Sequence, residues 1–211
     1  MLTIALSKGY LMKESFPVLA QAGIKIADVE QASRKLVFFD TTKQFKFLVI
    51  RPTDVPVYVE HGAADIGIAG KDIMEENKDS VAELLHLRFG YCRLVTAAPK
   101  GVRDIYKPNV RIATKFVNCA ERYFASRGVK AEIIKLYGSI ELAPQLNLAD
   151  AVVDLVATGT TLKENGLEIV DTIFHSTARL VANKIQLRVK YPEIIALTKK
   201  LQKIVSKIRI K

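Results

Sequence analysis

Residues 151–162, with the sequence AVVDLVATGTTL, contain an apolar run, one acid and a turn of threonine and glycine. The apolar run fits a buried strand, and the Lys/Glu/Asn run after the turn fits the start of a helix. Such a strand-to-helix turn leaves several backbone N–H groups unpaired and directed at one point, where a phosphate can accept hydrogen bonds. The hydroxyls of Thr158, Thr160 and Thr161 add donors, and Gly159 lets the chain turn sharply and approach an anion closely.

Asp154 lies inside this apolar run, shortly before the turn. An acid is costly to bury in an apolar strand unless it has a purpose. Because a carboxylate repels a phosphate, we expect Asp154 to serve sugar hydroxyls or a magnesium ion beside the phosphate. The segment as a whole therefore favours a site for a phosphorylated ribose. The alternative is an ordinary strand-to-helix turn with a good helix cap.

The other residues that could carry chemistry are scattered. Cys92 and Cys119 have no second metal ligand nearby in sequence, so we expect neither a disulfide nor a zinc site. His61, His86 and His175 form no pair with metal-ligand spacing. The sequence also holds no Ser/His/Asp or Cys/His arrangement, no P-loop motif and no convincing GxGxxG, which disfavours hydrolases, P-loop proteins and Rossmann oxidoreductases.

The composition is that of a globular protein, with 211 residues, 49% of them hydrophobic and 26% charged. The formal net charge is +10. Much of the excess lies in residues 184–211, where lysines alternate with apolar residues at helical spacing, so this tail predicts an amphipathic helix with a solvated basic face. We expect the charge to attract polyanionic small substrates or an acidic partner protein. Nucleic-acid binding is the alternative, but the chain lacks interleaved aromatic residues and has no tryptophan, so we expect no nucleic-acid partner.

The sequence also bears on location. No apolar stretch approaches the roughly 20 residues that span a bilayer. The N-terminus leads directly into an apparent strand, without the charged and apolar regions of a signal peptide. We therefore expect a cytoplasmic protein with no membrane partner.

Predicted strands and helices alternate along the chain, which indicates an α/β fold with mixed, largely parallel sheets. Two series of strands are expected, the first at residues 2–6, 35–39, 45–50 and 64–70, and the second at 91–97, 111–113, 131–136 and 151–156. Each series contains Ala-Asp, a short apolar strand and a glycine-containing loop, so we predict two similar lobes around a central cleft. Lobe I is expected to hold residues 1–90 and 182–211, with the C-terminal helix, and lobe II residues 91–181, with the phosphate turn.

Further blocks follow one another along nearly the whole chain. They are ALSKG at residues 5–9, SRKL at 33–36, RPTDVP at 51–56, GAADIGI at 62–68, GKD at 70–72, KLYGS at 135–139 and STARL at 176–180. Together with the turn described above, they resemble the short-form catalytic chains of the ATP phosphoribosyltransferase family, which perform the first step of histidine biosynthesis. The family joins N1 of the ATP adenine to C1 of phosphoribosyl pyrophosphate and releases pyrophosphate. Its fold resembles that of the two-lobed type II periplasmic binding proteins.

The resemblance implies roles for individual residues. The turn holds the 5-phosphate of the ribose through Thr158, Gly159, Thr160 and Thr161, and Ala157 is a further substrate-binding residue. Asp154 and Glu141 hold ribose hydroxyls, and magnesium arrives with the two substrates rather than in a metal site of the protein. Lys8 and Arg34 bind the pyrophosphate, since arginine can donate in a fork to its oxygens, and Arg51 is a further substrate-binding residue.

Tyr10 stands where the family usually has arginine, so this catalytic position supplies one hydrogen-bond donor and no positive charge. Arg34 and Arg51 could instead form surface ion pairs, which is the usual role of arginine.

The resemblance also implies partners. Short-form chains work with a regulatory subunit related to histidyl-tRNA synthetase in a hetero-octamer, and histidine inhibits through that subunit. The chain itself is expected to form a homodimer or a larger assembly. The alternative function is a non-catalytic two-lobed protein that binds small anions. That alternative predicts a secretion signal and no phosphate turn, which is the reverse of what this sequence shows.

Overall fold

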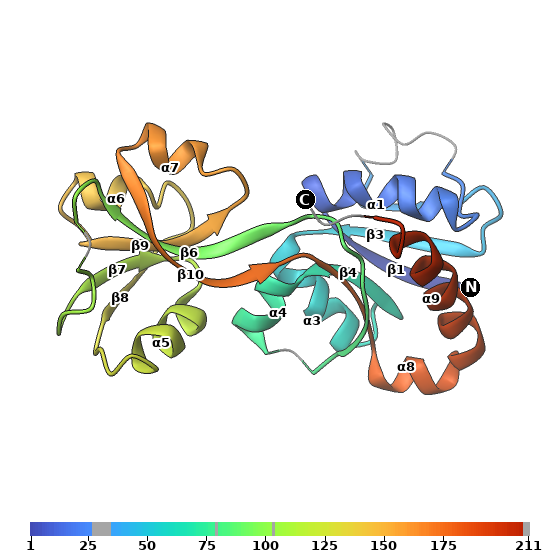
Figure 1. The fold of residues 1–211 in the computed structure, drawn as a ribbon. Helices are drawn as coiled ribbons and strands as arrows, with labels where there is room; N and C mark the ends of the chain where they lie inside the picture. Colours follow the sequence, from blue (N-terminus) through green and yellow to red (C-terminus); the bar gives the residue numbers. More distant parts are fainter. Residues whose placement is uncertain (27–34, 79, 103, 209–211) are drawn as a thin grey trace. The chain divides into compact units, whose positions relative to one another are not determined.

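The computed structural model describes residues 1–26, 35–78, 80–102 and 104–208. The chain divides into two compact units, of which unit 1 comprises Met1–Tyr91 and Thr177–Lys211 and unit 2 comprises Cys92–Ser176. Each unit is built around one sheet (Figure 1). Residues 177–181, which the sequence analysis assigns to lobe II, lie in unit 1, because the strand they form pairs with strands of the first sheet.

The sheet of unit 1 has six strands in the described part of the chain. Their order is β2 (Val37–Phe39), β3 (Phe45–Ile50), β1 (Leu2–Ser7), β4 (Ile66–Gly70), β11 (Ala178–Ala182) and β5 (Ala82–His86). β1 lies between β3 and β4 and is parallel to both. At one edge, β2 is antiparallel to β3. Toward the other edge, β11 lies between β4 and β5 and is antiparallel to both.

Helices cover both faces of this sheet. Among the described residues of this unit, the helical elements are α1 (Tyr10–Gln21), the 3-10 turn η1 (Pro52–Asp54), α3 (Val55–Glu60), α4 (Lys71–Asn77), α8 (Lys184–Val189) and α9 (Tyr191–Val205). Successive side chains of β1 point to opposite faces. Leu2, Ile4 and Leu6 belong to the core that includes α1 and α9, whereas Ala5 packs in a second cluster with α3. α9 is the predicted amphipathic C-terminal helix, with its buried residues spaced three and four apart at Ile194, Leu197, Leu201 and Val205.

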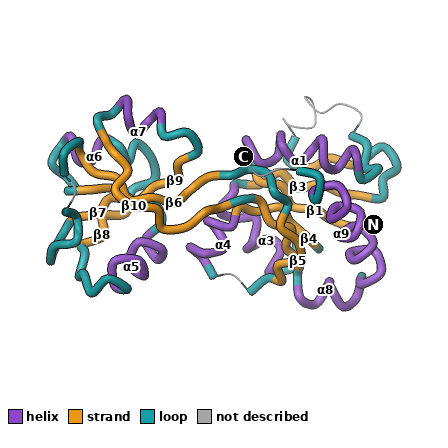
Figure 2. The backbone as a smooth tube through the Cα atoms, viewed as in Figure 1, coloured by secondary structure: helices purple, strands orange, loops and turns teal. Residues whose placement is uncertain are grey.

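The sheet of unit 2 has five strands in the described residues. Their order is β10 (Leu167–Ser176), β6 (Cys92–Pro99), β9 (Ala151–Val156), β7 (Arg111–Thr114) and β8 (Glu132–Lys135). β7 is parallel to β8 and β9, while β6 is antiparallel to β9 and to β10, its long neighbour in Figure 2. Helices α6 (Leu142–Gln145) and α7 (Thr160–Glu164) lie on one side of the sheet and α5 (Val117–Ala125) on the other (Figure 1).

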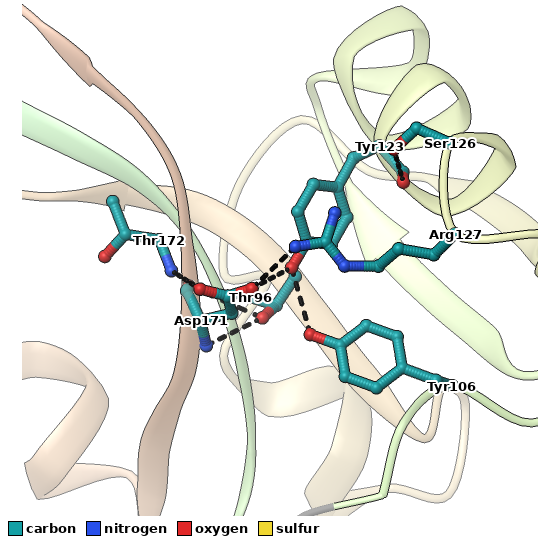
Figure 3. A network of polar contacts seen from close by, with 7 residues as sticks. All are labelled: Thr96, Tyr106, Tyr123, Ser126, Arg127, Asp171 and Thr172. Carbon is teal, nitrogen blue, oxygen red and sulfur yellow. Dashed lines mark hydrogen bonds and ion pairs between the residues drawn. The ribbon is translucent and has the colours of Figure 1, made fainter.

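A polar network ties the end of α5 to β10 (Figure 3). The hydroxyl of Tyr123 donates to Oδ2 of Asp171 at 2.7 Å, and the guanidinium of Arg127 pairs with the same oxygen at 2.8 Å. Asp171 lies at an irregularity in the β10–β6 ladder, where its N–H donates to the hydroxyl of Thr96. The Tyr123 hydrogen bond is the main cause of the lowered pKa of Asp171. The network therefore fastens a helix to a strand at a point where the regular pairing is interrupted.

The predicted α/β class with mixed sheets is confirmed. Four of the nine strand pairings in the described residues are parallel, so the sheets are less parallel than expected, because β2, β6, β10 and β11 run against their neighbours. None of the helices in the described part of the chain is long and apolar enough to cross a membrane.

Candidate active site

The predicted phosphate turn follows β9 directly and leads into α7. β9 is central in the sheet of unit 2, and its residues Ala151, Val152 and Val153 are fully buried, which fixes where the strand ends. Val156 and Leu162 are also buried and hold the two ends of the turn in the core of unit 2. The exposed residues between these two anchors are therefore presented by a rigid frame.

The turn itself leaves donors free. Gly159 has a φ of 87°, a left-handed conformation that favours glycine, although a Cβ there would meet only Val156 at 3.7 Å. The hydroxyls of Thr158 and Thr160 lie 3.0 Å apart. Among the described residues, the backbone N–H groups of Gly159, Thr161 and Leu162 have no hydrogen-bond acceptor. Three N–H groups without an acceptor among the described residues thus lie beside threonine hydroxyls in one short segment, which suits an anion with several oxygens.

A small cavity joins this turn to the two predicted acids. It has a volume of about 170 Å³ and is lined by Glu141, Asp154, Leu155, Val156, Ala157, Thr158, Gly159, Thr160, Thr161 and Leu162. Seven of these ten residues are the substrate-binding residues predicted in unit 2: Glu141, Asp154, Ala157, Thr158, Gly159, Thr160 and Thr161. A shallower hollow on the solvent side is lined by Thr158, Gly159, Thr160, Lys163 and Glu164. The cavity lining therefore combines two carboxylates with neutral donors.

Asp154 carries an unusual carboxylate. Its side chain is 16% exposed, and Oδ1 is buried with no hydrogen-bond partner among the described residues. Burial raises the pKa of Asp154 above its ordinary value, and Glu141 adds to this, whereas Lys115 and the N–H of Leu155 oppose it. A buried acceptor without a donor costs free energy in the ligand-free protein, and a bound hydroxyl would remove that cost.

Lys115 is a residue that the sequence analysis missed. Its Nζ lies 3.9 Å from Oδ1 of Asp154. Lys115 follows β7, whose carboxyl end lies beside that of β9 because the two strands are parallel. Lys115 comes soon after a predicted strand, at residues 111–113, which is a sequence feature that could have pointed to it. That feature is informative only once this strand is known to lie beside the strand that carries Asp154.

The predicted residues of unit 1 behave differently from one another. Lys8 and Arg51 line a common cavity of about 430 Å³, together with Leu36, Val37, Leu48, Val49, Ile50, Asp54 and Tyr58. Within the described residues, neither side chain has an ion pair or a hydrogen bond, so both positive charges are available to an anion. Tyr10 is 65% exposed at the start of α1 and does not line this cavity. Arg34 lies outside the described residues.

The arrangement suits binding and electrostatic stabilisation rather than covalent catalysis. The cavity beside the turn contains hydroxyls of threonine and two carboxylates but no cysteine, histidine or lysine. No group of three or more His, Cys, Asp or Glu residues that could hold a metal ion occurs in the part of the chain that the structure describes. In unit 2 the described residues supply the neutral donors of the turn and the carboxylates of Asp154 and Glu141. In unit 1 they supply the positive charges of Lys8 and Arg51.

Comparison with known proteins agrees with this geometry. Residues 51–209 match the family model described as ATP phosphoribosyltransferase. The ATP phosphoribosyltransferase of Marinobacter nauticus is 49% identical over 99% of this chain and 97% of its own length. That of Caldanaerobacter subterraneus subsp. tengcongensis is 46% identical over 97% of each chain.

Solved structures give the same result for the fold. A chain of the ATP phosphoribosyl transferase (HisG:HisZ) complex from Thermotoga maritima matches with a TM-score of 0.84 and 37% identity, covering 99% of this chain and 100% of that one. The periplasmic aliphatic sulphonate-binding protein of Escherichia coli has a TM-score of 0.61 at 13% identity, covering 97% and 72%, which shows a shared fold. The predicted likeness to periplasmic binding proteins is thus confirmed, and the chain belongs to the ATP phosphoribosyltransferase family.

Proposed function

We infer that this chain transfers the 5-phosphoribosyl group of phosphoribosyl pyrophosphate to N1 of the adenine of ATP, as the first step of histidine biosynthesis. Membership of the family supports the reaction. The observation that carries the residue assignments is the turn with unpaired N–H groups beside an acid whose buried oxygen has no donor among the described residues. A protein that binds small anions without catalysis is not favoured, because the relatives that match over nearly the whole chain are named as transferases.

The 5-phosphate is assigned to residues 157–161. The N–H groups of Gly159 and Thr161 have no other acceptor among the described residues, and the hydroxyls of Thr158 and Thr160 lie side by side in the same turn. The 5-phosphate takes no part in the bond changes. Neutral N–H and hydroxyl donors suit such a group, because they hold it in a fixed place by hydrogen bonds.

Asp154 and Glu141 are assigned to the ribose hydroxyls. Both line the cavity that the turn closes. Hydroxyls can donate to Oδ1 of Asp154, which lacks a donor among the described residues. The same two negative charges stabilise the positive charge that the ribose develops as pyrophosphate leaves and its anomeric carbon gains oxocarbenium character.

Lys8 and Arg51 are assigned to anionic groups of the substrates, with Lys8 on the pyrophosphate. Their charges are free of protein partners among the described residues, and they line a shared cavity. Arg34 keeps its assignment to the pyrophosphate as a prediction from the family resemblance. Tyr10, exposed at the start of α1, likewise keeps its catalytic assignment as a prediction from the family resemblance.

Magnesium is proposed to enter with phosphoribosyl pyrophosphate and ATP and to act as part of the substrates. The oxygens that suit it in unit 2 are those of Asp154 and Glu141, since magnesium prefers carboxylates and phosphates. The chemistry it supplies is neutralisation of the leaving pyrophosphate. The cytoplasmic location expected from the sequence stays a prediction.

A regulatory partner is proposed as well. The Thermotoga maritima structure is that of a HisG:HisZ complex, and its matching chain is similar to this one over its whole length. We assign to this chain a regulatory subunit related to histidyl-tRNA synthetase, a hetero-octameric assembly, and at least a homodimer of the chain itself.

The direct test is an assay of the purified chain with ATP, magnesium and phosphoribosyl pyrophosphate, with and without a candidate regulatory subunit. The product absorbs ultraviolet light differently from ATP, and released pyrophosphate is measured in parallel. We expect one pyrophosphate per product molecule and no reaction when either substrate is omitted. Tight binding of phosphoribosyl pyrophosphate without any product, in both arms, would favour the anion-binding alternative.

A further inference from the structure

Lys115 is held in a fixed place beside Asp154 by the two residues that flank it. The buried hydroxyl of Thr114 donates to the carbonyl of Val153 at 2.7 Å and accepts from the N–H of Phe116 at 2.9 Å. Phe116 is itself buried, with 1% exposure. Because Thr114, the last residue of β7, is paired with Val153 in the parallel ladder, Lys115, which follows it, comes level with Asp154. The backbone of Lys115 is thus clamped on both sides.

The position of Lys115 matters because of the charges around Asp154. Asp154 and Glu141 both line the small cavity, and the charge of Glu141 makes the negative charge of Asp154 less favourable. In the described part of the chain, Lys115 is the cation within ion-pair distance of Asp154. At 3.9 Å from Nζ, Oδ1 is too far for a hydrogen bond to Lys115 and therefore keeps its acceptor capacity for another donor.

We propose that Lys115 is a positioning residue for the ribose. Its positive charge offsets the negative charge of the Asp154 carboxylate and fixes the orientation of the carboxylate, while Oδ1 stays open to a sugar hydroxyl. This inference rests on the proposed function, because it takes phosphoribosyl pyrophosphate as the ligand of the cavity. Lys115 is not among the residues that line the cavity, so it acts through Asp154. The raised pKa of Asp154, which Lys115 opposes, agrees with this role.

The ordinary alternative is a solvated surface lysine. Its side chain is 43% exposed, and its Nζ lies 5.0 Å from the centre of the Phe116 ring. Exposed ion pairs contribute little. Here, however, the partner is a largely buried carboxylate with an unsatisfied oxygen, and removing the counter-charge of such a group has a larger effect.

The experiment measures phosphoribosyl pyrophosphate affinity by calorimetry and the steady-state constants for Lys115→Met, Lys115→Arg, Asp154→Asn and the double variant Lys115→Met/Asp154→Asn. Lys135→Met is the matched control, because Lys135 ends β8 level with Thr114, one strand farther from Asp154. We expect Lys115→Met to weaken binding and raise the KM for phosphoribosyl pyrophosphate about tenfold, with the KM for ATP unchanged. Lys115→Arg recovers most of the loss, and Lys135→Met has no effect.

The double variant decides whether Lys115 works through Asp154. We expect Lys115→Met to cause no further loss of affinity once Asp154 is already asparagine. Losses that multiply would overturn the proposal, since Lys115 would then act on the substrate by itself. Equal rises in both KM values, or the same loss in Lys135→Met, would overturn it too. A wild-type chain that binds phosphoribosyl pyrophosphate but forms no product refutes the proposed function alone, because the affinity comparison still tests Lys115.

Discussion

Replacing Asp154 by asparagine is expected to make the ligand-free protein more stable and the enzyme less active. The substitution keeps the shape of the side chain and removes its charge. In the wild-type chain, that charge is largely buried, Oδ1 has no hydrogen bond among the described residues, and the nearest cation is 3.9 Å away. Removing a buried charge with such incomplete compensation returns ~1 kcal/mol of unfolding free energy. For a chain of this size this corresponds to a melting temperature about 2–4 °C higher.

Activity changes in the opposite direction. An asparagine at this position presents less negative charge to the ribose and accepts its hydroxyls more weakly. We expect kcat/KM for phosphoribosyl pyrophosphate to fall by about 10²–10³, the effect of losing a buried charge-assisted hydrogen bond. Thermal unfolding followed by calorimetry and the ultraviolet assay measure both consequences on the same sample. A variant that is less stable than wild type and retains its activity would refute the reasoning.

The pH dependence of stability distinguishes Asp154 from an ordinary acid nearby. Because burial raises the pKa of Asp154 in the folded state, the folded chain takes up that proton at a higher pH than the unfolded chain. The gain from Asp154→Asn should therefore be present at neutral pH and shrink as the pH falls through the raised pKa. Asp150 is the control: hydrogen bonds from Arg111 lower its pKa, so Asp150→Asn should destabilise at neutral pH and lose that effect in acid.

Three further substitutions test other parts of the molecule. Gly159→Ala should cost about 1–2 kcal/mol of backbone strain, because φ is 87° there, and it should weaken phosphoribosyl pyrophosphate binding in calorimetry by turning the N–H groups aside. Tyr10→Arg should raise kcat about tenfold, because an exposed side chain at this position can accommodate the arginine usual in the family and supply a charge-assisted hydrogen bond. Lys190→Met should lower the unfolding free energy by about 2–3 kcal/mol in denaturant titration, since it removes the ion pair of Asp65, whose side chain is 6% exposed.

Two of these substitutions have a control in the same chain. Gly166 has a φ of 68° and open space around its Cα, so Gly166→Ala should cost the same strain without affecting substrate binding. Among the described residues, the Lys184 side chain makes one hydrogen bond, an exposed one to Ser80, so Lys184→Met should change stability little. A turnover of Tyr10→Arg equal to or below that of wild type would count against the interpretation of Tyr10.

The strand, turn and helix of residues 151–164 could be predicted because their pattern is local. An apolar run, an acid and a Thr-Gly turn before a helix are contiguous in sequence, and strand, turn and helix follow from side-chain type and spacing. The C-terminal helix was predictable for the same reason. Its apolar residues recur at a helical period, and the structure buries Ile194, Leu197, Leu201 and Val205.

What escaped prediction depends on which strands become neighbours. Lys115 comes level with Asp154 only because β7 lies beside β9, an arrangement that the chain order alone does not dictate. Residues 178–181 were assigned to lobe II and no strand was expected there, yet they belong to β11 inside the sheet of unit 1. The sheet that this strand joins is set by packing between segments far apart in sequence.

A crystal structure of the chain with phosphoribosyl pyrophosphate and magnesium bound would test the assignment of the sugar phosphate to the turn after β9. We expect the 5-phosphate within hydrogen-bond distance of the N–H groups of Gly159 and Thr161, and a ribose hydroxyl donating to Oδ1 of Asp154. A sugar phosphate bound elsewhere, with the 158–161 turn facing only solvent, would show that the assignment is wrong.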